Sequence, residues 1–143
     1  MTIETILQGR SGAIHSCTAD MSISDAVTFL SEKRIGAVPV LDGERVVGIF
    51  SERDVLHCIR EFGGAAAMDK QVRDVMTADV VSVAPGKSAI GALSLMSKRR
   101  FRHLPVVEDD KLVGFISIGD LVQYRIDKIE SEADAMRDYI QSA

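Results

Sequence analysis

The stretch GFISIGD, residues 114–120, repeats an outline that occurs earlier as GIFSERD, residues 48–54. In each copy a glycine and two apolar residues lead to a serine, and an aspartate follows three residues after that serine. Short apolar runs are typical of buried strands, and S-x-x-D is typical of the first turn of a helix. Each stretch is therefore predicted to form a corner where a strand runs into a helix.

The likeness between the two corners extends well beyond them at a constant offset of 66 residues. Identical residues meet, without a gap, at ten positions between residues 17 and 60 of the first copy. They are Ser22/Ser88, Ala26/Ala92, Ser31/Ser97, Arg34/Arg100, Pro39/Pro105, Val40/Val106, Val47/Val113, Gly48/Gly114, Ser51/Ser117 and Asp54/Asp120. A self-match at a fixed period indicates that the chain is built from two structural repeats.

Each repeat is predicted to run helix, strand, strand, helix. The expected strands are residues 37–41 and 46–50 in the first copy and 104–107 and 112–116 in the second, with short leading strands at 16–18 and 80–83. One unit of about 60 residues has too little cover to bury its sheet alone. We therefore expect an α/β chain of the α+β kind, in which two repeats related by a pseudo-twofold axis pack their sheets together.

The predicted domain boundaries follow from this arrangement. The first repeat with its N-terminal segment takes residues 1–66, the second repeat takes 67–126, and a C-terminal helix takes 127–143. The segment Gly63–Ala67 is interpreted as a helix end and linker. Apolar residues of the tail recur at steps of three and four from Leu121 to Ile140, so this helix either packs on its own domain or forms a dimer contact.

Composition narrows the function classes. The 143 residues carry a net charge of −4 with both signs mixed, which argues against a broad nucleic-acid or membrane surface. The N-terminus lacks the pattern of a signal peptide, and no apolar run approaches the ~20 residues of a membrane span. Cys17 and Cys58 form no CxxC pair, so we expect two reduced, buried thiols and a cytoplasmic protein.

No enzyme motif is present in the sequence. It contains no P-loop, HExxH, GxGxxG or nucleophile elbow, and its three histidines have no recognisable catalytic partners. We therefore predict no catalytic residue and no metal site.

The chemistry of the two corners favours a small anionic ligand over a purely structural helix cap. A helix N-terminus attracts phosphate, and a serine there adds a hydroxyl donor. A carboxylate one turn in, Asp54 or Asp120, can accept hydrogen bonds from the two hydroxyls of a ribose. Gly48 and Gly114 lie inside strands, where a missing side chain lets a flat ring or another backbone approach. Together these groups describe a nucleoside phosphate.

Cations are also available near the second corner. The run 98–103 reads KRRFRH, whereas the first copy has only Lys33 and Arg34 there, with Arg53 inside its corner. The alternative interpretation of this basic run is a solvated helix end, where Lys and Arg favour the helix dipole.

The doubled pattern G-h-h-S-x-x-D, preceded each time by h-P-V and a polar turn, resembles a tandem pair of CBS domains, the Bateman module. The resemblance covers residues 1 to about 126. In detail, the sequence is similar to stand-alone bacterial CBS-pair proteins, including those named as signal-transduction or IMP-dehydrogenase-related proteins. It implies a regulatory module that binds an adenosine-containing ligand, such as AMP, ADP, ATP, NAD(H) or S-adenosylmethionine, in two clefts between the copies. It also implies a homodimer and an unidentified effector protein that reads the signal.

The resemblance assigns site residues as well. It places the ribose on Asp54 and Asp120, the phosphate-side hydroxyls on Ser51 and Ser117, and the adenine against the opposite copy. The remaining expected ligand-binding residues are Arg102, His103, Arg34, Arg100 and Arg53 as cations, His15, Ile35 and Arg10 beside Asp120, and Thr77, Val81 and Phe101 beside Asp54.

Because Gly36 and Ala37 replace Arg102 and His103 in the first copy, we expect unequal clefts, with the Asp120 cleft better suited to a phosphate-rich ligand. The alternative function is an adaptor that binds protein or RNA through residues 98–103 and the C-terminal helix.

Overall fold

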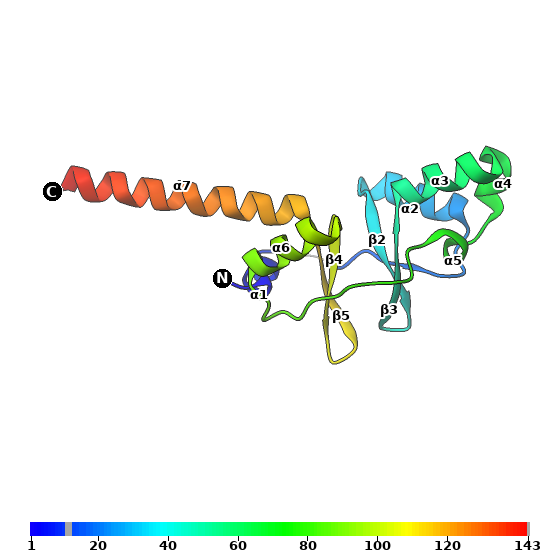
Figure 1. Ribbon diagram of the computed structural model, residues 1–143, viewed down its shortest axis with the longest axis horizontal. Helices are drawn as coiled ribbons and strands as arrows, with labels where there is room; N and C mark the ends of the chain where they lie inside the picture. The colour runs from blue at the N-terminus through cyan, green and yellow to red at the C-terminus, as the bar shows by residue number, and fades with distance from the viewer. Residues whose placement is uncertain (11–12, 143) are drawn as a thin grey trace.

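Two repeats lie side by side in the computed structural model, which describes residues 1–10 and 13–142 (Figure 1). Each repeat is a small sheet with helices packed against it, and strands β3 and β5 of the two repeats contact each other. The expected α/β fold of two packed repeats is confirmed.

The first repeat contains a three-stranded sheet in the order β1-β2-β3. Its elements are β1 (Cys17–Thr18), α2 (Ile23–Lys33), β2 (Ala37–Asp42), β3 (Arg45–Ser51) and α3 (Glu52–Phe62). β1 pairs parallel with β2, and β2 pairs antiparallel with β3. Helix α2 begins after Ser22, whose side chain accepts a hydrogen bond from the Asp25 N–H and so caps the first turn.

The second repeat follows the same plan with one strand fewer. Its elements are α6 (Ala89–Arg99), β4 (His103–Glu108), β5 (Lys111–Ser117) and α7 (Ile118–Ser142). The prediction of a leading strand at 80–83 is wrong. Within this segment Val83 forms a single parallel bridge with Val106, and no strand is formed. The Val80 N–H instead bonds the Ala78 carbonyl at 3.1 Å, a local turn that keeps the preceding residues out of the ladder.

The short helices that precede each repeat are exchanged between the repeats. Helix α1 (Ile3–Gln8) packs into the core of the second repeat, and Ile3 donates its N–H to the Lys87 carbonyl at 2.9 Å. Helix α5 (Val72–Val75) packs into the core of the first repeat, and Val72 donates to the Met21 carbonyl at 2.9 Å. This exchange ties the two halves together through buried side chains at both crossings.

Each repeat has its own hydrophobic core, to which β2 and β4 contribute runs of consecutive buried residues. Val38, Val40 and Phe50 are buried in the first core, and Leu104 and Ile116 in the second. Buried apolar area of this kind is the main favourable term in folding. The last core residues of β3 and β5, Phe50 and Ile116, directly precede the two corner serines.

The linker and the tail differ in detail from their expected form. Gly63, at φ +83°, ends α3, but helix α4 (Gly64–Asp69) starts at once, so most of the expected linker is helical. This helix crosses the predicted boundary between residues 66 and 67. Helix α7 is continuous from the second corner to Ser142 and projects away from both repeats (Figure 1). Within residues 1–10 and 13–142 no helix has the length and apolar character to cross a membrane.

Candidate ligand site between the two repeats

Both corners form the same hydrogen-bonded cap at the start of a helix. The Ser51 N–H donates to Oδ2 of Asp54 at 2.9 Å, and the Asp54 N–H donates to the Ser51 hydroxyl at 3.4 Å. At the second corner, the Ser117 N–H donates to Oδ2 of Asp120 at 2.7 Å, and the Asp120 N–H donates to the Ser117 hydroxyl at 3.1 Å. These capping boxes confirm the structural interpretation of S-x-x-D, and they fix each carboxylate through Oδ2.

The caps do not exclude a binding role, because each aspartate also lines a cavity. The Asp120 cleft has a volume of about 510 Å³ and lies between the second corner and the first repeat. Its lining residues are Leu7, Arg10, Ala13, Ile14, His15, Ile35, Gly36, Ala37, His103, Val113, Gly114, Phe115, Ser117 and Asp120. Thus Arg10, His15 and Ile35 lie beside Asp120 as the sequence predicts.

The Asp54 cleft is its counterpart, with a volume of about 530 Å³. Its lining residues are Gly36, Ile49, Ser51, Glu52, Arg53, Asp54, Leu56, Thr77, Asp79, Val80, Val81, Arg100, Phe101, Arg102 and His103. Thr77, Val81 and Phe101 lie here as expected. Both volumes fall within the range of about 300–1,000 Å³ that is usual for small-molecule sites.

The expected distribution of cations between the clefts is wrong. Arg100 and Arg102 line the Asp54 cleft, whereas the sequence argument assigned Arg102 to the Asp120 cleft. The carbonyl of Arg102 accepts a 2.8 Å bond from the Ile118 N–H at the start of α7, while Arg102 and Phe101 line the Asp54 cleft. His103 lines both clefts, and Arg34 lines neither.

Gly48 and Gly114 leave room for other segments of the protein, and not for a ligand ring alone. A Cβ atom on Gly48 would lie 2.6 Å from Sδ of Met76 and 3.0 Å from the Thr77 carbonyl. A Cβ atom on Gly114 would lie 2.6 Å from Cδ1 of Leu7. Gly114 therefore admits Leu7 of the exchanged helix α1, and Gly48 admits the residues that directly follow the exchanged helix α5.

An ion pair distinguishes the two aspartates. Nη2 of Arg10 lies 2.5 Å from Oδ2 of Asp120, and Nη1 donates to the Phe115 carbonyl at 2.9 Å. Partial burial acts to raise the pKa of Asp120, but the Ser117 and Arg10 hydrogen bonds outweigh it, so the pKa lies below its usual value. Burial raises the pKa of Asp54 despite its bonds from Ser51. The two clefts therefore present carboxylates of different acidity.

His103 sits where the two clefts meet. Its ring stacks on that of Phe115, with centroids 5.4 Å apart and planes 7° apart. Burial lowers the pKa of His103, Asp120 opposes that effect, and Arg102 adds to it. The His103 imidazole, which burial shifts toward its neutral form, provides a flat wall for an aromatic ligand at this junction.

Comparison with known proteins identifies the family. The family model of the CBS domain matches this chain twice, over residues 11–61 and 72–127, which is more than half of its length. This chain belongs to the CBS-domain family. The mitochondrial CBS-domain protein CBSX3 of Arabidopsis thaliana is 33% identical over 130 residues, which cover 87% of this chain and 63% of CBSX3. The chain thus spans less than two thirds of that relative.

Solved structures of CBS-domain proteins share the fold. A CBS-domain protein from Agrobacterium tumefaciens superposes with a TM-score of 0.80 at 35% identity, covering 87% of this chain and 92% of the other. CBSX2, solved in complex with AMP, superposes with a TM-score of 0.74 at 28% identity, covering 88% of this chain and 96% of the other.

The two CBS repeats differ in charge at one equivalent position that the sequence argument missed. Leu7 and Met76 occupy matching places against Gly114 and Gly48, and three residues further along stand Arg10 and Asp79. Arg10 lines the Asp120 cleft and Asp79 lines the Asp54 cleft. The likeness of residues 3–7 to residues 72–76, at an offset of 69 rather than 66, is the sequence signal that points to this reversal.

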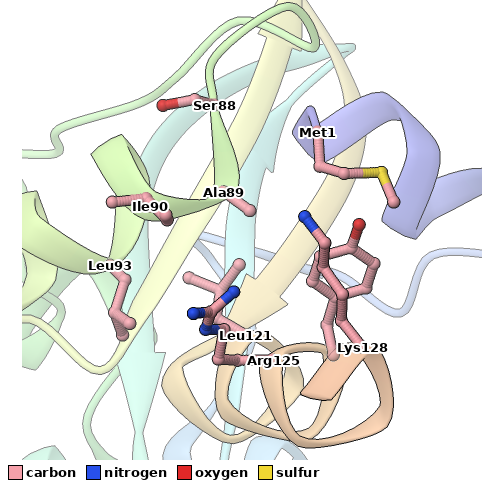
Figure 2. A pocket seen from close by; sticks show the side chains of 9 residues that line it. Met1, Ser88, Ala89, Ile90, Leu93, Leu121, Arg125 and Lys128 are labelled. Atoms are coloured by element: carbon pink, nitrogen blue, oxygen red, sulfur yellow. The ribbon is translucent and has the colours of Figure 1, made fainter. Parts of the chain in front are cut away.

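A third, smaller hollow lies away from both CBS clefts, between α6 and the start of α7. It has a volume of about 240 Å³, and Figure 2 shows Leu121, Arg125 and Lys128 entering it from α7. Its other lining residues are Met1, Ser88, Ala89, Ile90, Leu93 and Tyr124. Its walls are mainly apolar, and it contains neither corner aspartate, so the ligand chemistry of the corners does not extend to it.

Proposed function

We propose that this CBS pair is a regulatory module that binds an adenosine phosphate in the clefts between its repeats. The observation that carries the proposal is the combination found in each cleft. A capped aspartate is available for a ribose, apolar and aromatic walls are available for a base, and guanidinium groups are available for phosphate. Guanidinium is well suited to phosphate because its donors match the oxygens of the anion.

In the proposed complex, the ribose hydroxyls donate to the carboxylate oxygen that the cap does not use, Oδ1 of Asp54 or Asp120. The Asp54 cleft offers Arg53, Arg100 and Arg102 to phosphate, whereas the Asp120 cleft offers Arg10, already bound to its aspartate. We therefore propose, in contrast to the sequence-based expectation, that the Asp54 cleft takes the more phosphate-rich ligand.

AMP, ATP and NAD(H) share adenine, ribose and phosphate, and all three fit this description. AMP has additional support, because CBSX2, a relative of 28% identity over most of the chain, was solved in complex with AMP. The site roles of the individual residues remain predictions.

Such a module signals by changing its own arrangement rather than by catalysis. A ligand that contacts both repeats shifts the population toward the arrangement that it binds better. His103 and Gly36, which line both clefts, provide a route by which one cleft senses the other. We propose that an effector protein, or a second copy of this chain, reads the resulting change.

Isothermal titration of protein that has been unfolded, freed of ligand and refolded tests the proposal. AMP, ATP or NAD(H) should give saturable heat and raise the melting temperature, and the double variant that combines Asp54→Asn with Asp120→Asn should lose both responses. The absence of heat and of a thermal shift with all three nucleotides would refute it. Salt-sensitive retardation of RNA in a gel, with no nucleotide response, would favour the adaptor alternative instead.

A further inference from the structure

The outer half of α7 is not covered by any other part of the chain that the structure describes. From Ile129 to Ser142 every residue of this helix is exposed, and Figure 1 shows that no other element lies beside this part. Helices in proteins gain most of their stability from packing an apolar face, so an isolated extension of this kind is marginal in water. A partner that covers the apolar side of this segment would therefore stabilise the helix.

The apolar residues of α7 form a heptad seam. Counting with Ile126 at position a, the a positions are Ile126, Ala133 and Ile140, and the d positions are Val122, Ile129 and Met136. The side chains of Ile126, Ile129 and Ile140 are 43%, 50% and 66% exposed. A repeat with apolar a and d residues over about three heptads is the pattern of a coiled coil.

This seam is not the face that α7 packs on its own domain. Leu121 is 2% exposed and belongs to the core of the second repeat, whereas its neighbour Val122 is 43% exposed. Leu121 and Lys128 turn toward the hollow beneath α6 in Figure 2. The helix thus has one face that packs on its own domain and a second apolar row that is exposed.

We infer that α7 pairs in parallel with α7 of a second copy of this chain, as a two-stranded coiled coil. The charges that flank the seam indicate that the partner is a second copy of α7 in parallel orientation. In a parallel pair each g residue lies beside the e residue five positions later on the partner. Glu132 then faces Arg137, and Arg125, which lines the hollow beside α6 in the single chain, turns out of it to face Glu130. Both kinds of pair are attractive, and each occurs twice.

An antiparallel pair of α7 helices can also bury all six a and d residues, but its flanking charges do not attract. It places Glu130 opposite Glu130 and Glu132 opposite Glu132 of the two chains, because e then meets e and g meets g. Like charges at such positions destabilise, and flanking charges set partner orientation in coiled coils. Among the described residues of the single chain, Arg137 pairs with Asp134 of its own helix, at 3.5 Å and well exposed, and a partner carboxylate can replace this pair at little cost.

A parallel pair has a consequence for the assembly. It brings both CBS pairs to the same end, with the two Asp120 corners at the start of the joined helices. This inference goes beyond nucleotide binding and does not depend on it.

Sedimentation equilibrium of the full chain tests the pairing. We expect wild-type protein to have twice the 15.5 kDa mass of one chain. Ile129→Asp should raise the dimer dissociation constant at least tenfold, while the matched control Ser131→Asp, at the outward f position, should not. Glu132→Arg should also weaken the dimer, and adding Arg137→Glu should restore it.

Crosslinking tests the direction. An Ala133→Cys variant should form a disulfide-linked dimer on mild oxidation, because equal a positions meet only in a parallel pair, and Ser131→Cys should not. Cys17 and Cys58 are buried and do not compete. A wild-type monomer, or a dimer insensitive to Ile129→Asp, would overturn the inference. Loss of the dimer in Ile129→Asp without a disulfide in Ala133→Cys would overturn the parallel arrangement.

Discussion

Replacing Asp54 by asparagine separates its role as a helix cap from its proposed role as a ribose ligand. Oδ2 of Asp54 accepts from the Ser51 N–H at 2.9 Å, and an asparagine amide oxygen can keep that bond. The amide NH₂ that replaces Oδ1 cannot accept from a ribose hydroxyl. Loss of one hydrogen bond to a charged acceptor, about 1.5–3 kcal/mol, should weaken AMP binding about tenfold to about 150-fold.

The matched control is Asp74→Asn. Asp74 makes the same cap in α5, where its Oδ2 accepts from the Gln71 N–H at 3.0 Å, but it lines neither cleft. Both substitutions remove a carboxylate from a helix N-terminus, which costs about 0.3–1 kcal/mol of stability. The two variants should therefore melt alike and differ only in affinity.

The assay is isothermal titration with AMP and with 2′-deoxy-AMP, in an Asp120→Asn background so that one cleft reports. With Asp54 present, the deoxy ligand should bind more weakly than AMP. In the Asp54→Asn variant the difference should shrink, because the acceptor of the 2′-hydroxyl is gone. An AMP-to-deoxy-AMP affinity ratio that is the same with and without the Asp54→Asn change would refute the ribose assignment.

Three other perturbations address charge, burial and backbone conformation. Arg10→Ala should raise the pKa of the Asp120 carboxyl in a ¹³C NMR titration, because the guanidinium at 2.5 Å helps to hold it below its usual value; an unchanged midpoint would show that the ion pair does not persist in solution. Burial raises the pKa of the Cys17 thiol from 9.0 to about 11, so its contribution to stability is complete below pH 9 and is lost as pH rises toward 11; denaturant unfolding should show a decline of about 2–3 kcal/mol that Cys17→Ala abolishes. Asp110→Gly should raise the melting temperature by about 3 °C, because Asp110 sits at φ +62° in the β4–β5 turn, where an L side chain costs about 1 kcal/mol; calorimetry showing no gain would mean that the turn is not strained.

The repeat architecture could be predicted from the sequence because local and periodic signals agree. The corner pattern ending in Asp54 and Asp120 marks a strand, a cap and a helix at once, and the offset of 66 residues aligns both copies. Residues directly beside each aspartate were therefore placed correctly, and so were those that the family resemblance assigns to the opposite repeat, such as Ile35 and Phe101.

The features that sequence reasoning missed depend on long-range geometry. The exchange of α1 and α5 between repeats leaves no local trace, because Ile3 and Val72 would look equally apolar in either core. Arg102 lines the Asp54 cleft because of the way its segment of backbone faces the two repeats. The presence of basic residues before a strand in the sequence does not predict that orientation.

Crystals of the ligand-free protein soaked with AMP test the central claim most directly. Difference density should show AMP in a cleft shared by the two repeats, with its ribose hydroxyls within hydrogen-bonding distance of Asp54 or Asp120. Density for AMP at another place, such as the hollow between α6 and α7, or a ribose turned away from both carboxylates, would contradict it.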